Sequence, residues 1–596
     1  MSVISYMKLS FNRAFDQWWN KKKRPAIAWM SILWLLLIGW LAFFWNLGST
    51  GLIDETEPLF AEAARQMTVT GDWITPFFDG ETRFDKPALI YWLIALAYKI
   101  LGVNSWAVRL PSAIAAMGLV GVGFYTLLLF GDSTSKSSVQ STRNWFCAAL
   151  GSALMALNPL TIVWARTGVS DMLLTGCIGA ALLSFFIGYA QPSKPALQAR
   201  WYLAFYVLIA GAILTKGPVG IVLPGLVIGL FLLYLGNALE VLREMRLLLG
   251  SVVIAAIALP WYVLIIWRNG RAFIDSFFGY HNLERFTEVV NGHAAPWYFY
   301  FLVVLLGFAP WSVYLPSAIA RLQFWQRSRW RSAPRSSHLG LFALCWFASI
   351  FGFFTIAVTK LPSYVLPLMP AAAILVAIMW NSAWSVKGKK QPYLLVWSGW
   401  LNVIFLLAVA GALFYLPDLI GADPAIPNLD KLIQRSGLPV LGSVIWGLTA
   451  LLGAVLLLRC RGRWLWSVNL VGFIAFVIFV LTPAYFLVDQ ARQLPLRELS
   501  AIAAKADQPS EDLIMIGFKK PSVVFYAQRS VTYIKTADEG VAYVQQWATN
   551  PMPPRSLLVL SQPKRVQRVA RQVNQYQELG KSGAYQLIRV FKNQAG

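Results

Sequence analysis

The side chains best suited to catalysis lie in one long polar stretch, residues 51–112, between two apolar runs of the chain. The stretch follows an apolar run directly, so its first carboxylates, Asp54 and Glu55, are expected at a membrane surface. Two adjacent acids at an apolar boundary repel each other and lose hydration, which can raise the pKa of one of them. A carboxylate of that kind can accept a proton from a substrate hydroxyl. The stretch therefore predicts acid–base chemistry at a membrane surface.

The same acids also have a purely structural interpretation. Asp54 and Glu57 have the spacing of a capping box, which would begin a helix over residues 57–67. Such a pattern supplies acceptors to the free N–H groups of a helix start. The two interpretations agree if Glu57 caps the helix and Asp54 faces a cleft.

Cationic side chains near other apolar run ends could bind a phosphate. Lys86 lies between Asp85 and a proline that opens a helix, and Lys216 lies in the segment LTKGPVG between two apolar runs. A lysine at a helix start suits a phosphate, but it can equally be an interfacial lysine whose charge reaches water. The same alternatives apply to Arg166, which could simply pair with Asp171, and to Arg285, Lys360 and Tyr364.

The sequence predicts no metal site and no nucleotide site. His281 and His293 lack metal-ligand spacing with any neighbour. The chain has no glycine-rich dinucleotide fingerprint and no P-loop, so the activated substrate is not expected to be a nucleotide. We expect no required cofactor, and a dependence on a divalent metal stays open.

The elements that position these residues are membrane-spanning helices. Of the 596 residues, 57% are hydrophobic and only 13% are charged. The repeated apolar runs are long enough to cross a bilayer as helices, and we expect about 13 of them. The expected spans lie near residues 28–48, 105–130, 144–163, 172–190, 201–214, 218–236, 248–267, 297–319, 339–358, 362–381, 393–415, 438–458 and 464–487.

The charge pattern orients this path in a membrane. The net charge of +24 could suggest nucleic-acid binding, but the Lys and Arg residues cluster in short segments between apolar runs. With residues 1–27 as a basic cytoplasmic N-terminus, most of these clusters fall on the inner face, as the positive-inside rule requires. The candidate residues then fall on the outer side, in a first outer loop at 49–110, a second at 268–296, and at outer span ends. We therefore expect a multi-pass membrane protein with its active site at the outer face of the membrane.

The composition changes after about residue 489. Residues 28–488 form the expected transmembrane domain, and residues 489–596 are polar and mixed. The runs DLIMIGF, SVVFYA, VTYI, SLLVLS and AYQLIRVF predict strands, and LRELSAIAAKA predicts a helix. We expect a small α/β domain with its own core on the outer side of the membrane.

A set of short motifs carries a family resemblance. They are IDETEPLFAEAARQM, GDWITPFF, FDKPALIYW, RLPSA, RTGVSDMLL, LTKGPVG, HNLERF, GHAAPWYFY and KLPSYVLPLMP. Jointly and in this order they resemble the ArnT-like aminoarabinose transferases of the dolichyl-phosphate-mannose protein mannosyltransferase superfamily. These are family 39/83-like glycosyltransferases of GT-C architecture. PSVVFYAQRSVTYI resembles the small periplasmic domain of that family. The resemblance implies a bacterial inner-membrane protein whose active site and small C-terminal domain face the periplasm.

The resemblance implies a polyprenyl-phosphate-linked sugar as donor and a membrane-presented acceptor, such as a lipid A-like glycolipid, a protein or a polysaccharide. It implies a catalytic role for Asp54, as the base of an inverting transfer, and for Asp171 near the cavity. Cationic and phenolic groups would stabilise the phosphate leaving group. The residues that we expect to bind substrate or lipid phosphate are Lys86, Lys216, Arg285, Tyr364, Arg166 and Lys360.

Two other functions stay open. A transporter or flippase of lipid-linked sugars also needs cations and a lipid entrance, but it predicts polar residues across the whole membrane, whereas here they gather on the outer side. A polymer ligase or oligosaccharyltransferase-type enzyme shares the architecture and uses another acceptor. We expect the bilayer and the lipid donor as partners and no nucleic acid; the sequence makes no prediction of oligomeric state.

Overall fold

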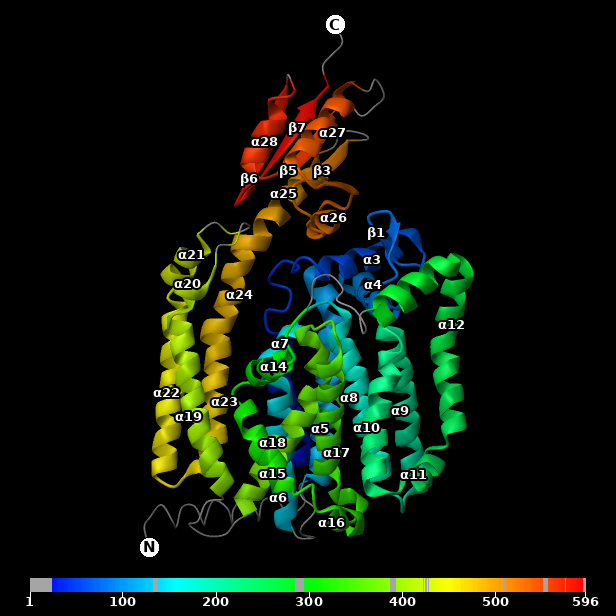
Figure 1. Ribbon diagram of the computed structural model, residues 1–596, viewed down its shortest axis with the longest axis vertical. Helices are drawn as coiled ribbons and strands as arrows, with labels where there is room; N and C mark the ends of the chain where they lie inside the picture. Colours follow the sequence, from blue (N-terminus) through cyan, green and yellow to red (C-terminus); the bar gives the residue numbers. More distant parts are fainter. Residues whose placement is uncertain are drawn as a thin grey trace.

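The computed structural model is a bundle of helices with a small β-sheet at one end (Figure 1). The structure describes residues 24–131, 138–284, 294–385, 393–421, 423, 426, 428–506, 511–549, 556–573 and 575–592. At one end of the bundle lie α11 (Ala238–Met245) and α16 (Arg327–Ser332), and at the other lie α3 (Glu57–Thr70) and α4 (Leu89–Leu101) (Figure 1).

Apolar helices of different lengths make up the bundle. In chain order they are α2 (Arg24–Gly39), α5 (Ser105–Phe130), α6 (Ser138–Ala156), α7 (Pro159–Ala165), α8 (Ser170–Tyr189), α9 (Pro195–Lys216), α10 (Val219–Leu235), α12 (Leu247–Ile274), α14 (Phe299–Gly307), α15 (Leu315–Leu322), α17 (Leu339–Ile356), α18 (Met369–Ser385), α19 (Tyr393–Phe414), α22 (Leu438–Leu458), α23 (Leu465–Phe476) and α24 (Thr482–Val488). Two short helices, α20 (Leu416–Leu419) and α21 (Leu429–Ser436), join α19 to α22. Many apolar side chains on the outside of the bundle are exposed, as a lipid-facing surface requires.

The multi-pass helical class is confirmed. In the part of the chain that the structure describes, 10 helices are long and apolar enough to cross a membrane, or 12 if two bent helix pairs each form one span. The bent pairs are α6 with α7, where Pro159 opens the second helix after a bend of 64°, and α14 with the segment Ser312–Leu322. Helix α10, with 17 residues, matches a further expected span but is slightly shorter than the others. The count of about 13 stays a prediction.

The C-terminal residues form a five-stranded sheet in the order β4-β3-β5-β7-β6. The strands are β3 (Asp512–Ile516), β4 (Val531–Ile534), β5 (Ser556–Ser561), β6 (Tyr576–Ser582) and β7 (Tyr585–Phe591). β3 is parallel to β4 and β5, and β7 is antiparallel to β5 and β6. Leu513 and Met515 pack on one face, and Ile514 and Ile516 on the other, because successive side chains of a strand alternate. Both faces are therefore buried, and the expected small α/β domain is confirmed.

Helices cover both faces of this sheet. One face packs against α25 (Leu494–Lys505) and α26 (Ser522–Ala527), and the other against α27 (Ala537–Thr549) and α28 (Pro563–Ala570). The last long helix continues from α23 through α24 into α25, so it connects the bundle to the sheet without a break. The proposed boundary at residue 489 lies inside this continuous helix.

One strand prediction in this region was wrong. SVVFYA forms α26, which begins after Pro521 and carries the chain from β3 to its parallel neighbour β4. A crossover between parallel strands must pass over one face of the sheet, and its apolar residues are buried for that reason. Its β-branched residues resemble a strand, but the topology requires a helix. Strand β6 was not predicted, since its side chains are mostly exposed and polar.

A buried ion pair holds the first outer loop onto the bundle. Arg109, on α5, is fully buried and donates from Nε to Oε1 of Glu57 at 2.8 Å. The Glu57 carboxylate also accepts from the N–H groups of Ile53 at 2.8 Å and Gly168 at 2.7 Å. These contacts join α3, α5 and the turn before α8 at one point. The predicted capping box is wrong, because α3 begins at Glu57 after Thr56, which makes no side-chain cap.

Replacing Arg109 with Met should destabilise the protein by about 3–5 kcal/mol, because it leaves the Glu57 carboxylate buried and without its cation. The free energy of unfolding, or the melting temperature in detergent, measures this change. The double variant Arg109→Met with Glu57→Gln should be more stable than Arg109→Met alone, since it removes the uncompensated charge. Equal stability of the single and double variants would contradict the role of the pair.

Candidate active site

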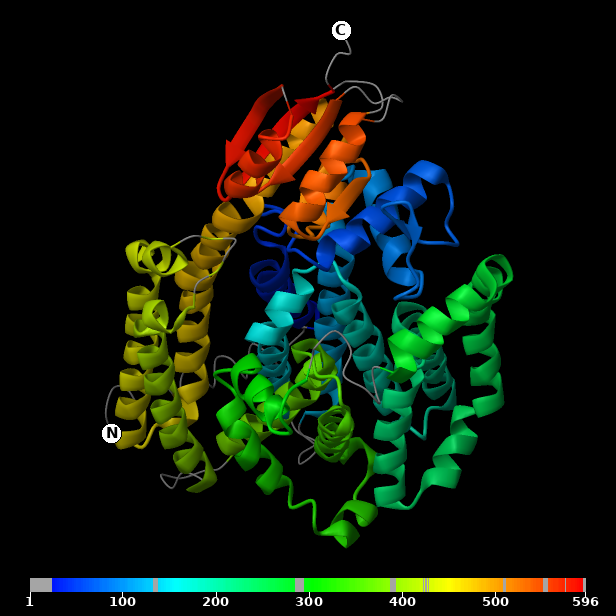
Figure 2. The ribbon, with the colours of Figure 1, turned by 45° about the horizontal axis from the view of Figure 1, so that its top comes forward.

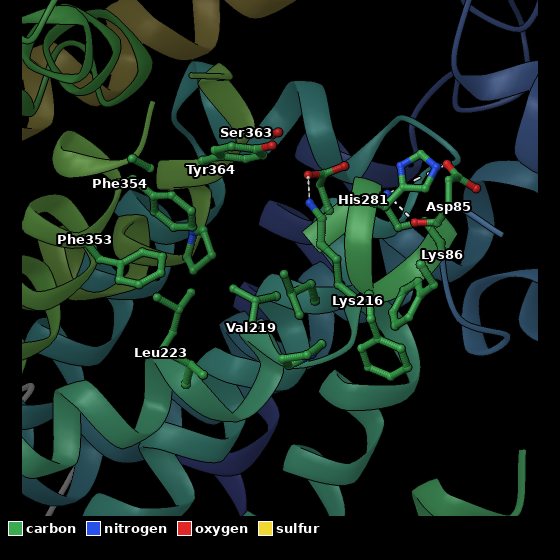
Figure 3. Close-up of a pocket in the computed structure, with 18 residues that line it drawn as sticks. Asp85, Lys86, Lys216, Val219, Leu223, His281, Phe353, Phe354, Ser363 and Tyr364 are labelled. Carbon is green, nitrogen blue, oxygen red and sulfur yellow. Dashed lines mark hydrogen bonds and ion pairs between the residues drawn. The ribbon is translucent and has the colours of Figure 1, made fainter. Parts of the chain in front are cut away.

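A cavity of about 500 Å³ brings two of the predicted cationic residues, Lys86 and Lys216, together at the end of the bundle that carries the first outer loop (Figure 3). It opens between the loop before α4, the ends of α8, α9, α10 and α17, the π-helix η2 (Asp275–Glu284) and the 3-10 helix η5 (Pro362–Leu368). Its lining residues are Asp85, Lys86, Asp171, Leu174, Lys216, Pro218, Val219, Val222, Leu223, Phe277, Phe278, His281, Phe353, Phe354, Ala357, Ser363, Tyr364 and Pro367.

The first cation of the cavity is Lys216, the last residue of α9. Its Nζ lies 2.7 Å from Oδ1 of Asp171 in the first turn of α8, and both side chains are mostly buried. Gly217 follows with a φ of 74°, which ends α9 and favours glycine. A Cβ at this position would lie 2.6 Å from the Phe277 ring, so the close approach of η2 also requires glycine. The sequence LTKGPVG therefore places the ammonium group of Lys216 at the cavity wall.

The second cation is Lys86, in the loop that leads into α4. Its Nζ donates to the backbone oxygen of Asp85 at 2.7 Å and lies 3.8 Å from Oδ2 of the same residue. Arg83 donates to that carboxylate at 2.6 Å, and the Tyr91 hydroxyl donates to Oδ1 at 3.1 Å. Burial alone would raise the pKa of Asp85, but Arg83, Lys86 and His281 outweigh burial and lower it to about 2. Asp85 is therefore an anion that helps to hold Lys86 in place.

The opposite wall is apolar and aromatic. Phe353 and Phe354 from α17 and Tyr364 from η5 lie across the cavity from Asp85, and Val219 and Leu223 lie at its base (Figure 3). The Tyr364 ring lies 5.5 Å from Nζ of Lys216, within range of a cation–π contact. Two cations at one side of a cavity with hydrocarbon walls suit an anionic head group with an attached apolar chain.

His281 is a cavity residue that the sequence did not identify. It lies on η2, beside Asp85 (Figure 3). Gly270, with a φ of 58°, breaks α12 and lets the chain turn back over the cavity. The motif HNLERF was the available signal, but without metal-ligand spacing the histidine had no assigned partner. The positive φ of Gly270, which lies 11 residues before His281, could not be predicted from the sequence pattern.

Two other predicted residues, Lys360 and Arg166, lie elsewhere. Nζ of Lys360 donates to the backbone oxygens of Thr355 at 2.9 Å and Ala357 at 2.6 Å. Arg166 donates to the backbone oxygen of Asn46 at 3.3 Å, and it does not pair with Asp171. Neither side chain lines the cavity. Arg285 falls outside the described residues.

Asp54 also lies away from the cavity lining, at the contact between the first outer loop and the C-terminal sheet domain. Its Oδ1 accepts from the N–H of Ser522 at 3.0 Å, and its Oδ2 accepts from the Ser522 hydroxyl at 2.5 Å. Burial raises the pKa of Asp54, and the hydrogen bonds from Ser522 oppose that effect only in part. Asp54 is thus a more basic carboxylate than Asp85.

The described residues contain no group of three or more His, Cys, Asp or Glu side chains that could hold a metal ion. Asp85, Asp171 and His281 are the potential ligands that line the cavity, and both carboxylates are already paired with cations. We therefore derive no step through a metal.

Two family models match the chain. "Dolichyl-phosphate-mannose-protein mannosyltransferase" matches residues 85–267, which carry Lys86, Asp171 and Lys216. "Cyanobacterial RgtA-type glycosyltransferase, C-terminal domain" matches residues 506–595, which contain the whole sheet.

Several similar proteins are undecaprenyl phosphate-alpha-4-amino-4-deoxy-L-arabinose arabinosyl transferases. That of Aeromonas hydrophila is 30% identical over 392 residues, covering 65% of this chain and 66% of the relative. That of Aeromonas salmonicida is 29% identical over 437 residues, covering 72% and 73%. Among solved structures, ArnT from Cupriavidus metallidurans bound to undecaprenyl phosphate has a TM-score of 0.74 at 21% identity, covering 96% of this chain and 99% of that one. The last comparison supports the fold.

Replacing Arg83 with Met should make stability depend on pH in a defined direction. In the native protein Asp85 stabilises the fold above its unfolded pKa, about 4, and this contribution is lost as the pH falls toward about 2. In the variant Asp85 is still buried but has lost the Arg83 cation, so its pKa is higher than in the native protein. Protonation of Asp85 at low pH then removes the uncompensated negative charge. The deficit in melting temperature relative to the native protein should therefore be largest near neutral pH and shrink as the pH falls to about 4.

Arg268→Met is the matched control, because Arg268 pairs with Asp72 at 3.0 Å but has a half-exposed side chain. Its deficit should be small and independent of pH. A deficit of Arg83→Met that stays constant over this pH range would contradict the electrostatic account of Asp85.

Proposed function

We propose, since the chain is an ArnT-like glycosyltransferase of GT-C architecture, that it transfers a sugar from a polyprenyl-phosphate carrier to an acceptor at the outer face of the membrane. The observation that carries the proposal is the convergence of Lys86 and Lys216 at one side of an apolar cavity. Relatives are named for a donor built on undecaprenyl phosphate, and a protein of the same fold has been crystallised with that lipid. A lipid phosphate would lie between the two ammonium groups, with its chain along the apolar wall.

The proposed reaction is a single displacement. An oxygen of the acceptor attacks the anomeric carbon, and the bond between that carbon and the phosphate oxygen breaks. The electron pair leaves with the phosphate, where Lys86 and Lys216 neutralise the developing charge. The acceptor proton passes to a carboxylate base, and the configuration at the anomeric carbon inverts.

Two carboxylates are candidates for the base. Asp171 lines the cavity, but its ion pair with Lys216 at 2.7 Å makes it better suited to orienting that lysine. Asp54 has a pKa raised by burial, which keeps it basic enough to take a proton. We therefore assign the base to Asp54, acting on an acceptor that approaches between the first outer loop and the sheet domain, and an orienting role to Asp171.

The assignment includes an orientation in the membrane. The Arg-rich helix α16 lies at the end of the bundle opposite to α3 and α4 (Figure 1). The positive-inside rule then supports a cytoplasmic N-terminus, about 13 spans, and a periplasmic cavity and sheet domain. In this arrangement residues 1–27 are cytoplasmic, 28–488 form the transmembrane domain and 489–596 the periplasmic domain. Arg166, Arg285 and Lys360 stay candidates for contacts with the donor lipid.

Mass spectrometry of envelope lipids and glycoproteins tests the proposal as a whole. A deletion strain should lack one sugar modification, and the native gene should restore it. If the protein is instead a flippase, it moves the lipid-linked donor across the membrane. The donor would then accumulate on the inner face of the membrane in the deletion strain. Restoration of the modification by a gene whose two cavity lysines are replaced would argue against the proposed site.

Lys86→Met and Lys216→Met should each lower transfer by about 100-fold or more, because each removes a cation that stabilises the leaving phosphate. Both variants should still be inserted in the membrane at native abundance. Lys99→Met is the matched control, since Lys99 lies at the end of α4 and contacts the Trp73 ring instead of the cavity. Its transfer should stay near that of the native protein, and near-native transfer by both cavity variants would refute the phosphate site.

Asp54→Asn should abolish transfer while leaving membrane insertion intact, because the amide cannot accept the acceptor proton. Asp171→Asn should weaken donor binding more than it slows turnover, since it changes the placement of Lys216. A rise in KM for the donor with Asp171→Asn, against a fall in kcat with Asp54→Asn, would separate the two roles. Substantial turnover by Asp54→Asn would eliminate it as the base.

A further inference from the structure

The carboxylate of Asp54 is surrounded by the C-terminal sheet domain. Ser522, the first residue of α26, donates to it twice, from its backbone N–H to Oδ1 and from its hydroxyl to Oδ2. Lys520, in the turn before α26, pairs with the neighbouring Glu55 at 3.3 Å. The sheet domain lies directly against the first outer loop (Figure 2). Residues more than four hundred positions apart in the sequence thus meet at the proposed base.

The titratable groups that face Asp54 are few and can be named. Glu55 lies on the same loop and raises the pKa of Asp54, and Lys520 lowers it. Tyr533 on β4 and Tyr585 on β7 also interact with the Asp54 charge. Apart from Glu55, all of these side chains belong to the sheet domain, so that domain sets the environment of the carboxylate.

The placement of Ser522 is fixed by contacts on both sides of it. The Tyr526 hydroxyl on α26 accepts from the N–H of Leu52 at 2.8 Å, and Asp489 accepts from the N–H of Gly51 at 2.7 Å. The N–H of Val531 donates to Asp79 of the same outer loop at 3.0 Å. Phe525 is buried in the apolar cluster that the loop forms with α3 and α4. The domain is therefore docked in one orientation, and Ser522 has no freedom to move away without breaking these contacts.

We infer that Ser522 is a positioning residue for the acceptor base: its two donors orient the Asp54 carboxylate and favour its ionised form. Each carboxylate oxygen has two lone pairs, so one hydrogen bond from Ser522 to each oxygen leaves a second lone pair for the acceptor proton. Hydrogen bonds to the charged form of an acid stabilise that form. The sheet domain is then part of the catalytic apparatus, and this inference rests on the proposed role of Asp54 as the base.

The test uses the full chain in the deletion strain, with the restored modification quantified by mass spectrometry. Cells are held at about pH 6 and at about pH 8, because an outer-facing carboxylate experiences the pH of the medium. Ser522→Ala removes one hydrogen bond to the ionised carboxylate, which should raise the pKa of Asp54 further. Product should therefore fall several-fold more at the lower pH than at the higher pH. Ser522→Thr keeps a hydroxyl and should preserve the native pH dependence.

Ser582→Ala is the matched control, since the Ser582 hydroxyl lies on the same domain and donates to Glu498 at its surface. This variant should behave as the native protein at both pH values. Loss of product by Ser522→Ala that is equal at both pH values, without rescue by Ser522→Thr, would show a merely structural role and overturn the inference. A native response of Ser522→Ala would also overturn it.

Asp54→Asn separates this inference from the proposed function. If Asp54→Asn is inactive and Ser522→Ala is native-like, the base assignment stands and the role of Ser522 fails. If Asp54→Asn restores the modification, the base assignment itself fails. Variant abundance in the membrane is measured in parallel, so that a folding defect is not taken for a loss of turnover.

Discussion

The geometry of the bundle end that carries α3 and α4 depends on the buried ion pair between Glu57 and Arg109. Both side chains are almost fully excluded from solvent, so neither charge can be left without the other. The pair connects the first outer loop to α5, and the third contact of Glu57, to the N–H of Gly168, connects it to the turn before Asp171. The loop that carries Asp54 and Lys86 is therefore held in register with the helix that carries Asp171. An active site formed by a loop and by helix ends from distant parts of the sequence needs a contact of this kind to fix their relative positions.

A second constraint selects what the cavity can bind. Ammonium groups in a mostly apolar cavity are costly unless an anion lies nearby, and Asp85 and Asp171 supply those anions in the structure. A phosphate diester would add further negative charge between Lys86 and Lys216, and its hydrocarbon chain would cover the Phe353 and Phe354 rings. The cavity thus combines the two chemistries of a lipid-linked sugar. A soluble nucleotide sugar would satisfy only the charged part.

The sequence predicted the converging residues better than their surroundings. Lys86, Asp171, Lys216 and Tyr364 were expected from the motifs and do line one cavity. The roles of the residues around these four could not be predicted from the sequence, because those roles depend on contacts between distant segments. The capping box at Asp54 and Glu57 is the clearest case. The local spacing favoured a capping box. In the structure Glu57 instead pairs with Arg109, and Asp54 accepts hydrogen bonds from Ser522.

The helical class followed from the hydrophobic pattern, since an apolar run that crosses a bilayer has few alternatives to a helix. The small sheet domain followed from the short β-rich runs after residue 489. SVVFYA was mistaken for a strand, because a short buried crossover helix has the same apolar composition. His281 was passed over because its approach to the cavity depends on the break in α12 at Gly270.

Lys86 and Lys216 are proposed to bind the phosphate of a polyprenyl carrier, and the proposed function depends on this binding. Native mass spectrometry of the purified full-length protein, with added undecaprenyl phosphate, measures this binding directly. The account predicts a one-to-one complex with the native protein and its loss in the variant with both lysines replaced by Met, while Lys99→Met retains it. Equal binding of undecaprenyl phosphate by the native protein and the double variant would contradict the account.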